Sequence, residues 1–118
     1  EFIYDYPASQ AALAQVHTGA DGKNYADRFE LYLGGMELCN GYHELTDFKE
    51  QAKRFQEDLN LRKQMNKDLP LEDLRFLAAL EHGMPECSGV ALGFDRLAML
   101  ALGKQDIREV ILFPGDLA

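Results

Sequence analysis

Residues 28–44 read RFELYLGGMELCNGYHE, and this stretch decides the fold class. From Arg28 to Leu33 apolar and polar residues alternate, which is the period of a half-buried strand. Gly34-Gly35 predicts a two-residue hairpin turn, and the returning strand is predicted from Met36 to about Glu44. The stretch therefore predicts an antiparallel hairpin.

The register of this hairpin predicts where two carboxylates lie. A turn at Gly34-Gly35 pairs Tyr32 with Glu37 and places Glu30 opposite Cys39. Glu30 and Glu37 are then diagonal neighbours on one face, roughly 7 to 8 Å apart at the backbone. Such a pair suits a magnesium ion, which prefers oxygen ligands and often links carboxylates to substrate phosphates. The alternative is an ordinary solvated strand face.

The end of the returning strand carries a second polar group. Asn40, Tyr42 and Glu44 occupy alternate positions, so they share one face of the strand. An aromatic wall beside a carboxylate suits an ammonium group. Strict alternation places this group on the face opposite Glu37, so a single site requires a bulge between Glu37 and Asn40. The alternative is a polar strand end that leads into a helix.

A third pattern runs from Gly89 to Leu100, where a glycine-rich apolar run leads into a short apolar segment that carries Arg96. Glycine in a strand lets a ligand approach the backbone, and an arginine at the start of a helix can reach phosphates. Close packing of a strand against a helix requires glycine equally often. This pattern alone leaves both interpretations open.

The remaining sequence predicts an α+β fold with an antiparallel sheet and flanking helices. Helices are predicted by capping residues and helical spacing of apolar residues at 47–66, 71–82 and 96–102, the last with Asp95 as its cap. Strands are also predicted at 2–6, 88–94 and 110–113, and the turn-rich stretch 17–24 is predicted to be a surface loop. We expect the candidate residues on one concave face and the helices packed away from it.

Composition narrows the class of protein. The net charge of −8 and pI of about 4.7 disfavour a general nucleic-acid surface, because phosphate binding depends on Lys and Arg. Cys39 and Cys87 form no C-x-x-C pair, so their spacing predicts neither a zinc site nor a redox motif. No apolar run approaches membrane-spanning length, and we expect a cytoplasmic protein whose N-terminal part is missing.

Taken in order, these three patterns resemble the C-terminal half of a class II lysyl-tRNA synthetase catalytic domain. The matching segments are 28–31, 37–45 and 89–100, and the last resembles class II motif 3. Residues 6–10 and 111–114 also fall where that family has similar segments, so the resemblance covers nearly all of residues 1–118.

The resemblance implies a role for each candidate residue. Magnesium would be held by Glu30 and Glu37. The residues implied for ATP are Glu37, Leu38, Gly93 and Arg96, of which Glu37 and Arg96 are implied to be catalytic. The residues implied for the amino-acid substrate are Asn40, Tyr42, Glu44 and Ala91, with Glu44 on an amino group.

Two positions distinguish branches of this family. His43 stands where lysyl-tRNA synthetases usually have Ser, and Ala91 where they have Gly. Both resemble the branch that modifies elongation factor P. That resemblance implies ATP-dependent activation of lysine or (R)-β-lysine as its adenylate, followed by transfer to a lysine side chain of elongation factor P.

The same resemblance implies a homodimer and a chain that lacks motifs 1 and 2, so residues 1–118 alone are expected to be inactive. A lysyl-tRNA synthetase that charges tRNA is the first alternative. A non-catalytic synthetase-like binding module is an alternative of another class, and it would be expected to lose the paired carboxylates or Arg96.

Overall fold

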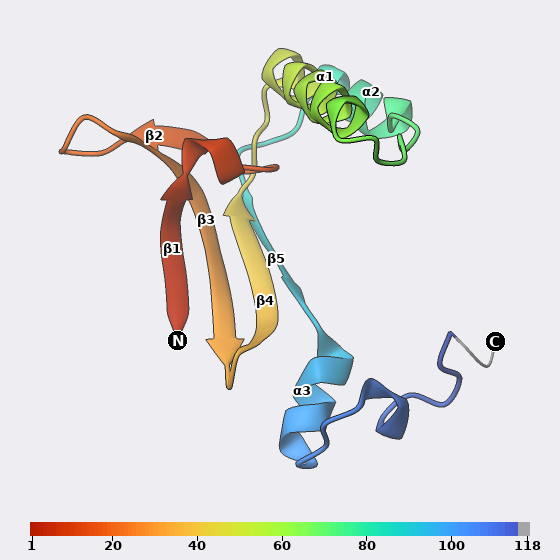
Figure 1. Ribbon diagram of the computed structural model, residues 1–118. Coiled ribbons are helices and arrows are strands. Elements are labelled where there is room, and N and C mark those ends of the chain that lie inside the picture. Colours follow the sequence, from red (N-terminus) through yellow and green to blue (C-terminus); the bar gives the residue numbers. More distant parts are fainter. Residues whose placement is uncertain (116–118) are drawn as a thin grey trace.

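The computed structural model describes residues 1–115, and its centre is one antiparallel sheet (Figure 1). The strand order is β1-β3-β4-β5, with β2 also paired to β3. The strands are β1 (Phe2–Pro7), β2 (Val16–Thr18), β3 (Asn24–Leu33), β4 (Met36–His43) and β5 (Ser88–Leu92). The helices are α1 (Phe48–Gln64), α2 (Leu74–His82) and α3 (Phe94–Ala101), with short 3-10 segments η1 (Ala8–Gln10) and η2 (Ile107–Glu109). The predicted α+β class is confirmed.

The hairpin between β3 and β4 has the predicted turn. Gly34 and Gly35 both have positive φ, 59° and 80°, which a tight hairpin turn requires and glycine adopts without strain. Tyr32 pairs with Glu37 as predicted. A bulge follows, because Leu31 pairs with Cys39 and leaves Leu38 without a partner on β3. The predicted break in alternation is therefore confirmed.

The bulge also corrects one predicted pair. Glu30 lies opposite Asn40, and the prediction that it lies opposite Cys39 is wrong. The extra residue in β4 shifts every pair beyond it by one position, which turns Asn40 and Tyr42 to the face that carries Glu30. The sequence indicated that such a shift was needed but not which residue supplied it.

Aspartate side chains set the starts of the two longer helices. Asp47 caps α1 by accepting from the N–H groups of Lys49 and Glu50, as predicted. Asp73 caps α2 in the same way, so that helix begins three residues later than predicted. No helix in residues 1–115 has the length and apolar character needed to cross a membrane.

The third helix begins earlier than predicted. Gly93 is the N-cap of α3, and Asp95 lies within the first turn of the helix, not at its cap. The chain passes directly from β5 into α3. The Gly93 N–H still donates to the Leu38 carbonyl, and α3 begins at the next residue, Phe94.

The helices lie at the two ends of the sheet. Figure 1 shows α1 and α2 together beyond one end and α3 beyond the other, so none of them covers the middle of the sheet. A small alanine core lies near the α1 end, formed by Ala11, Ala14 and Ala26, with Tyr6 and Tyr42 packed against it. This core supports the candidate residue Tyr42 and, beside it, Tyr6.

Two predicted segments differ from the structure. The predicted loop 17–24 contains most of β2, and β3 begins at Asn24, because the two strands pair as a hairpin. The predicted strand 110–113 is wrong: η2 precedes it, and Leu112 and Phe113 are 90% and 81% exposed. No strand among residues 1–115 pairs with this segment, so its apolar sequence alone does not make it a strand.

Candidate active site

Strands β3, β4 and β5 bring the candidate residues to one face of the sheet. Directly paired residues share a face, and the register pairs Tyr32 with Glu37, Glu30 with Asn40, and Asn40 with Ala91. Beyond these, Tyr42 pairs with both Arg28 and Gly89. The face therefore runs along β4 from Glu37 toward Glu44.

The residues predicted for ATP meet at the bulge. The Leu38 carbonyl accepts from the Gly93 N–H at 2.9 Å, and Arg96 Nη1 donates to the Glu37 carbonyl at 2.8 Å. The Glu37 carboxylate lies 4.0 Å from the same guanidinium. A Cβ on Gly93 would lie 3.3 Å from the Arg96 side chain, so this position keeps the arginine close to the strand.

A hollow of about 560 Å³ opens beside this cluster, between the hairpin tip and α3. Glu37 and Arg96 line it, with Tyr32, Gln105 and Asp106. An exposed arginine and a carboxylate on the wall of one hollow can bind phosphates and the cation that accompanies them. This is the end of the face that suits a nucleotide.

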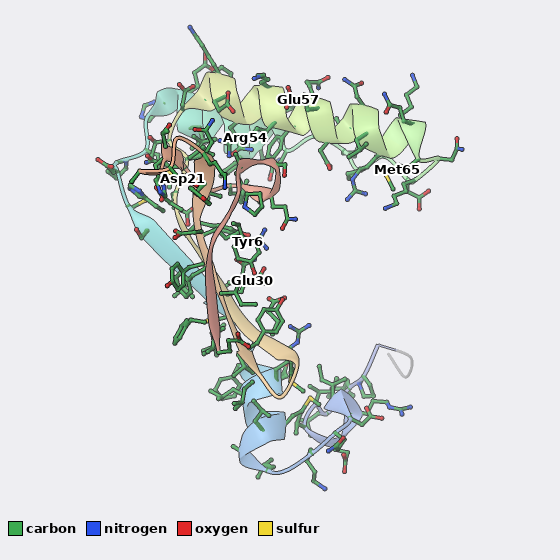
Figure 2. All side chains as sticks on the ribbon, turned by 60° about the vertical axis from the view of Figure 1, so that its left-hand side comes forward. Tyr6, Asp21, Glu30, Arg54, Glu57 and Met65 are labelled. Carbon is green, nitrogen blue, oxygen red and sulfur yellow. The ribbon has the colours of Figure 1, made fainter. Side chains whose placement is uncertain are left out.

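Glu30 is the centre of a hydrogen-bond network in the middle of the face. It is 5% exposed, and its Oε2 accepts from the hydroxyls of Tyr6 at 2.6 Å and Tyr32 at 2.7 Å. Its Oε1 forms an ion pair with Arg28. Tyr6 comes from β1, and Figure 2 shows its side chain and that of Glu30 on the same side of the sheet.

This network shifts the pKa values of its members. The hydrogen bond from Tyr6 is the main cause that lowers the pKa of Glu30 below its ordinary 4.5, and Tyr32 and Arg28 lower it further. Desolvation, then the bond to Glu30, raises the pKa of Tyr6 from 10.0 to about 12. The network therefore favours a charged Glu30 and a neutral Tyr6.

The network predicts how stability depends on pH. The Glu30 contribution is present above about pH 4.5 and is lost as pH falls through its lowered folded pKa. The Tyr6 contribution is present below pH 10 and is lost as pH rises through about 12. Urea unfolding of the chain as a function of pH measures both limits. Because the hydrogen bond to Glu30 also raises the pKa of Tyr32, Tyr6→Phe should reduce the alkaline loss without removing it, and it should weaken the acid loss. A variant with an unchanged pH profile would contradict the network.

The two carboxylates differ in how well they fit a metal ion. Among residues 1–115 no donor hydrogen-bonds the Glu37 carboxylate, whose one ion pair with Arg96 is 4.0 Å long, whereas both oxygens of Glu30 already accept hydrogen bonds. No group of three or more His, Cys, Asp or Glu that could hold a metal occurs in residues 1–115. Magnesium often uses one or two carboxylates together with substrate phosphates and water, and Glu37 fits that arrangement. Glu30 would join it only by releasing one of its present donors.

The far end of the face carries a free carboxylate. Two hydrogen bonds hold the Glu44 backbone. The Glu44 N–H donates to the Cys87 carbonyl at 2.9 Å, and Gln15 Nε2 donates to the Glu44 carbonyl at 3.1 Å. Its carboxylate has neither a cation nor a hydrogen-bond donor among residues 1–115, and its Oε1 lies only 2.6 Å from where a Cβ of Gly89 would be. Gly89 therefore makes room for a carboxylate that is available to a ligand.

Three residues of the face were not predicted from the sequence to be site residues: Tyr6, Arg28 and Tyr32. Arg28 and Tyr32 alternate with Glu30 along β3, so strand periodicity could have placed them on its face. Tyr6 had no such signal, because its position depends on the pairing of β1 with β3, more than 20 residues apart.

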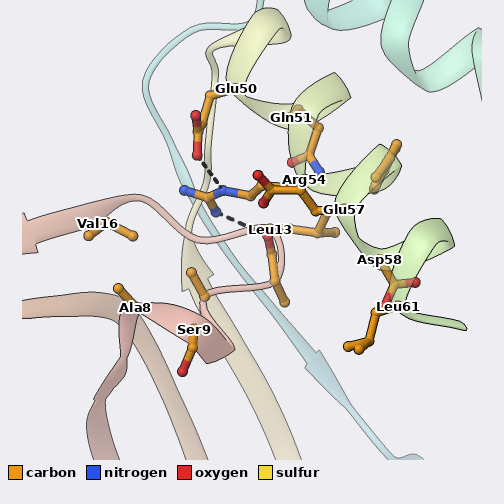
Figure 3. A pocket seen from close by; sticks show the side chains of 13 residues that line it. Ala8, Ser9, Leu13, Val16, Glu50, Gln51, Arg54, Glu57, Asp58 and Leu61 are labelled. Carbon is orange, nitrogen blue, oxygen red and sulfur yellow. Dashed lines mark hydrogen bonds and ion pairs between the residues drawn. The ribbon is translucent and has the colours of Figure 1, made fainter. Parts of the chain in front are cut away.

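A second hollow, of about 620 Å³, lies away from this face between α1 and the segment that follows β1 (Figure 3). Arg54 spans it and donates to the carbonyls of Ala12 and Ala14 at 3.1 and 2.7 Å. Gln51 is 1% exposed, and its amide atoms have no partner among the described residues. Gln51 lines the hollow with its amide atoms closed to solvent, and none of the candidate residues of the sheet face lines it.

Comparison with known proteins supplies the family. The protein-family model described as "tRNA synthetases class II (D, K and N)" matches residues 1–117. The chain is 55% identical over 111 residues to the elongation factor P–(R)-β-lysine ligase of Haemophilus ducreyi, 94% of the chain and 33% of the relative. It is 56% identical over 113 residues to the protein of that name from Proteus mirabilis, 96% of the chain and 34% of the relative.

The chain thus spans about one third of the length of these relatives. The family match, by contrast, extends over nearly every residue of the chain, including the whole face described above. The chain belongs to the class II tRNA synthetase family of the D, K and N type.

Proposed function

We propose that residues 1–118 form the C-terminal part of the catalytic domain, motif 3 included, of an elongation factor P–(R)-β-lysine ligase. The full-length protein, meaning a protein of the relatives' length that carries these residues, activates a lysine-type amino acid with ATP. It then transfers the amino acid to a lysine side chain of elongation factor P. The relatives at 55% and 56% identity carry this name, which supports the proposal.

The free carboxylate of Glu44 is the observation that carries the proposal. It stands at one end of a face whose other end, at Glu37 and Arg96, borders a hollow suited to phosphates. A lysine-type substrate carries ammonium groups and a carboxylate, so it can lie along β4 with an ammonium on Glu44 and its carboxylate toward the nucleotide. Asn40, Tyr42 and Ala91 line the path between the two ends.

The first step joins the amino acid to AMP. An oxygen of the substrate carboxylate attacks the α-phosphorus of ATP, the bond to the bridging oxygen breaks, and pyrophosphate leaves. Arg96 binds phosphate oxygens, and Leu38 and Gly93 shape the backbone against the nucleotide. Magnesium would be held by Glu37, with Glu30 as a second ligand once it releases one of its hydrogen-bond donors, and would neutralise charge on the phosphates.

The second step transfers the acyl group. The amine of a lysine side chain on elongation factor P attacks the acyl carbon, AMP leaves, and the amine loses a proton. No side-chain nucleophile is needed in either step, so positioning and electrostatics supply the catalysis. We propose that the full-length protein acts as a homodimer in the cytoplasm, and that residues 1–118 alone are inactive.

Pyrophosphate exchange tests the proposal in the full-length protein. Exchange with (R)-β-lysine, followed by transfer to elongation factor P and not to tRNA, is the expected result. Preferential charging of tRNA with α-lysine would instead identify a lysyl-tRNA synthetase. Exchange with neither amino acid would overturn the proposal in favour of a binding module.

Gly89→Ala is predicted to weaken amino-acid binding with little loss of stability. The new Cβ would lie 2.6 Å from Glu44 Oε1, and the end of a flexible side chain can move away at low cost. The KM for the amino acid should rise while the KM for ATP and the free energy of unfolding stay close to those of the parent. Val90→Ala, at the neighbouring 61% exposed position, is the matched control. An unchanged KM in Gly89→Ala would show that the placement of Glu44 does not depend on this glycine.

A further inference from the structure

A directed series of hydrogen bonds crosses the middle of the face, from Arg28 through Asn40 to Tyr42. We propose that Arg28 is a positioning residue that fixes the Tyr42 hydroxyl as a hydrogen-bond donor to the carboxylate of the amino-acid substrate. This inference rests on the proposed function and adds to it the side chain that binds the substrate carboxylate and the residue that orients that side chain.

Arg28 is held rigidly in this face. Its side chain is 16% exposed, and its guanidinium lies 4.5 Å from the centre of the Tyr6 ring and 5.7 Å from that of Tyr42. It donates to the Gln10 carbonyl at 2.9 Å and forms the ion pair with Glu30. The remaining nitrogen, Nε, donates to Asn40 Oδ1 at 3.3 Å.

These contacts determine which way the Asn40 amide points. A guanidinium has donors and no acceptor, so the Asn40 atom facing Arg28 must be the carbonyl oxygen. The amide nitrogen then faces Tyr42 and donates to its hydroxyl oxygen at 2.9 Å. A flipped amide would place two donors against each other at Arg28.

The orientation of Asn40 in turn determines what Tyr42 offers to a ligand. Because the Tyr42 oxygen accepts from Asn40, its own proton points elsewhere, and no atom of residues 1–115 accepts it. A ligand atom that takes this proton needs a lone pair. An ammonium group has none, whereas a carboxylate oxygen does, so the acid end of the substrate lies at Tyr42 and the ammonium lies farther on, at Glu44.

Asn40→Asp keeps the size and shape of the side chain but reverses the hydrogen bond between residue 40 and Tyr42. Aspartate still accepts from Arg28, but its second oxygen also accepts, so the Tyr42 hydroxyl turns inward and no longer serves the ligand. In pyrophosphate exchange by the full-length protein, Asn40→Asp and Tyr42→Phe should each raise the KM for the amino acid roughly 10- to 100-fold. The KM for ATP should stay within a few-fold of the parent value, and the double variant should be no worse than Asn40→Asp alone.

Substitutions of Arg28 test its positioning role. Lysine also has donors only, so Arg28→Lys should keep the Asn40 orientation and most of the amino-acid affinity. The amide of Arg28→Gln can either donate to Asn40 or accept from it, so it no longer fixes the Asn40 orientation, and its loss should lie between those of Arg28→Lys and Asn40→Asp. Costs of Asn40→Asp and Tyr42→Phe that add in the double variant would overturn the proposal, as would equal losses in the Lys and Gln variants.

A second readout separates this proposal from the proposed function. With ¹³C at the Cζ of tyrosine, the Tyr42 resonance should move downfield in Asn40→Asp, where the hydroxyl donates to a carboxylate, and stay in place in Arg28→Lys. This holds even if the parent shows no exchange with any amino acid, a result that would refute only the proposed function. A resonance unmoved in Asn40→Asp would refute the assigned direction.

Discussion

Replacing Glu44 by glutamine in the full-length protein is expected to abolish recognition of the substrate's ammonium group and to leave ATP binding largely intact. The Glu44 carboxylate is free of cations among residues 1–115, so the ammonium of the substrate would be its partner in a charge-assisted hydrogen bond. Removing one charge of an enclosed pair typically costs about 3 to 5 kcal/mol. At 1.4 kcal/mol per tenfold, the loss of amino-acid affinity should exceed about 100-fold.

The control for this variant is Glu37→Gln, at the opposite end of the same face. Glu37 lies beside Arg96 and the hollow suited to phosphates, so its loss should weaken ATP and magnesium binding and leave amino-acid affinity nearly unchanged. Direct titration with ATP and with the amino acid separates the two effects. If both variants lost affinity for both ligands equally, the division of the face into a nucleotide end and an amino-acid end would be wrong.

The second large effect is expected from Glu30→Gln, which should lower the free energy of unfolding by about 3 to 5 kcal/mol. The side chains of Glu30 and Arg28 are 7% and 16% exposed, so the substitution leaves a guanidinium in a poorly solvated place without its counter-charge. The glutamine oxygen could still accept from Tyr6 and Tyr32, but the amide nitrogen would then face the Arg28 guanidinium, donor against donor. Urea unfolding with a shared m-value measures the change.

Glu57→Gln is the matched control for Glu30→Gln. The Glu57 side chain on α1 is 65% exposed, and its contact with Lys53 is 3.9 Å, so its removal should change stability by no more than about 0.5 kcal/mol. Equal, small effects of the two substitutions would mean that water reaches the Glu30 and Arg28 pair and that the network does not stabilise the sheet. A large effect confined to Glu30 supports the network as the structural centre of the site.

The sequence by itself determined the features that depend on near neighbours. Alternation and the Gly34-Gly35 turn predicted the hairpin and the Tyr32 to Glu37 pair, because both require only local backbone geometry. Asp47 predicted the start of α1, because a cap acts on N–H groups two and three residues away. Strand alternation also indicated that Glu37 and Asn40 could share a face only if the strand had a bulge between them.

Only the tertiary structure decided which residue forms that bulge and what surrounds Glu30. Leu38 is the unpaired residue, and its carbonyl accepts from Gly93, which comes from a distant part of the chain. Tyr6 reaches Glu30 because β1 pairs with β3, and no local pattern encodes that pairing. The segment 110–113 has the composition of a strand but no neighbouring strand within residues 1–115. Backbone hydrogen bonds across a sheet join residues far apart in sequence, so strand composition becomes structure only where a partner strand is present.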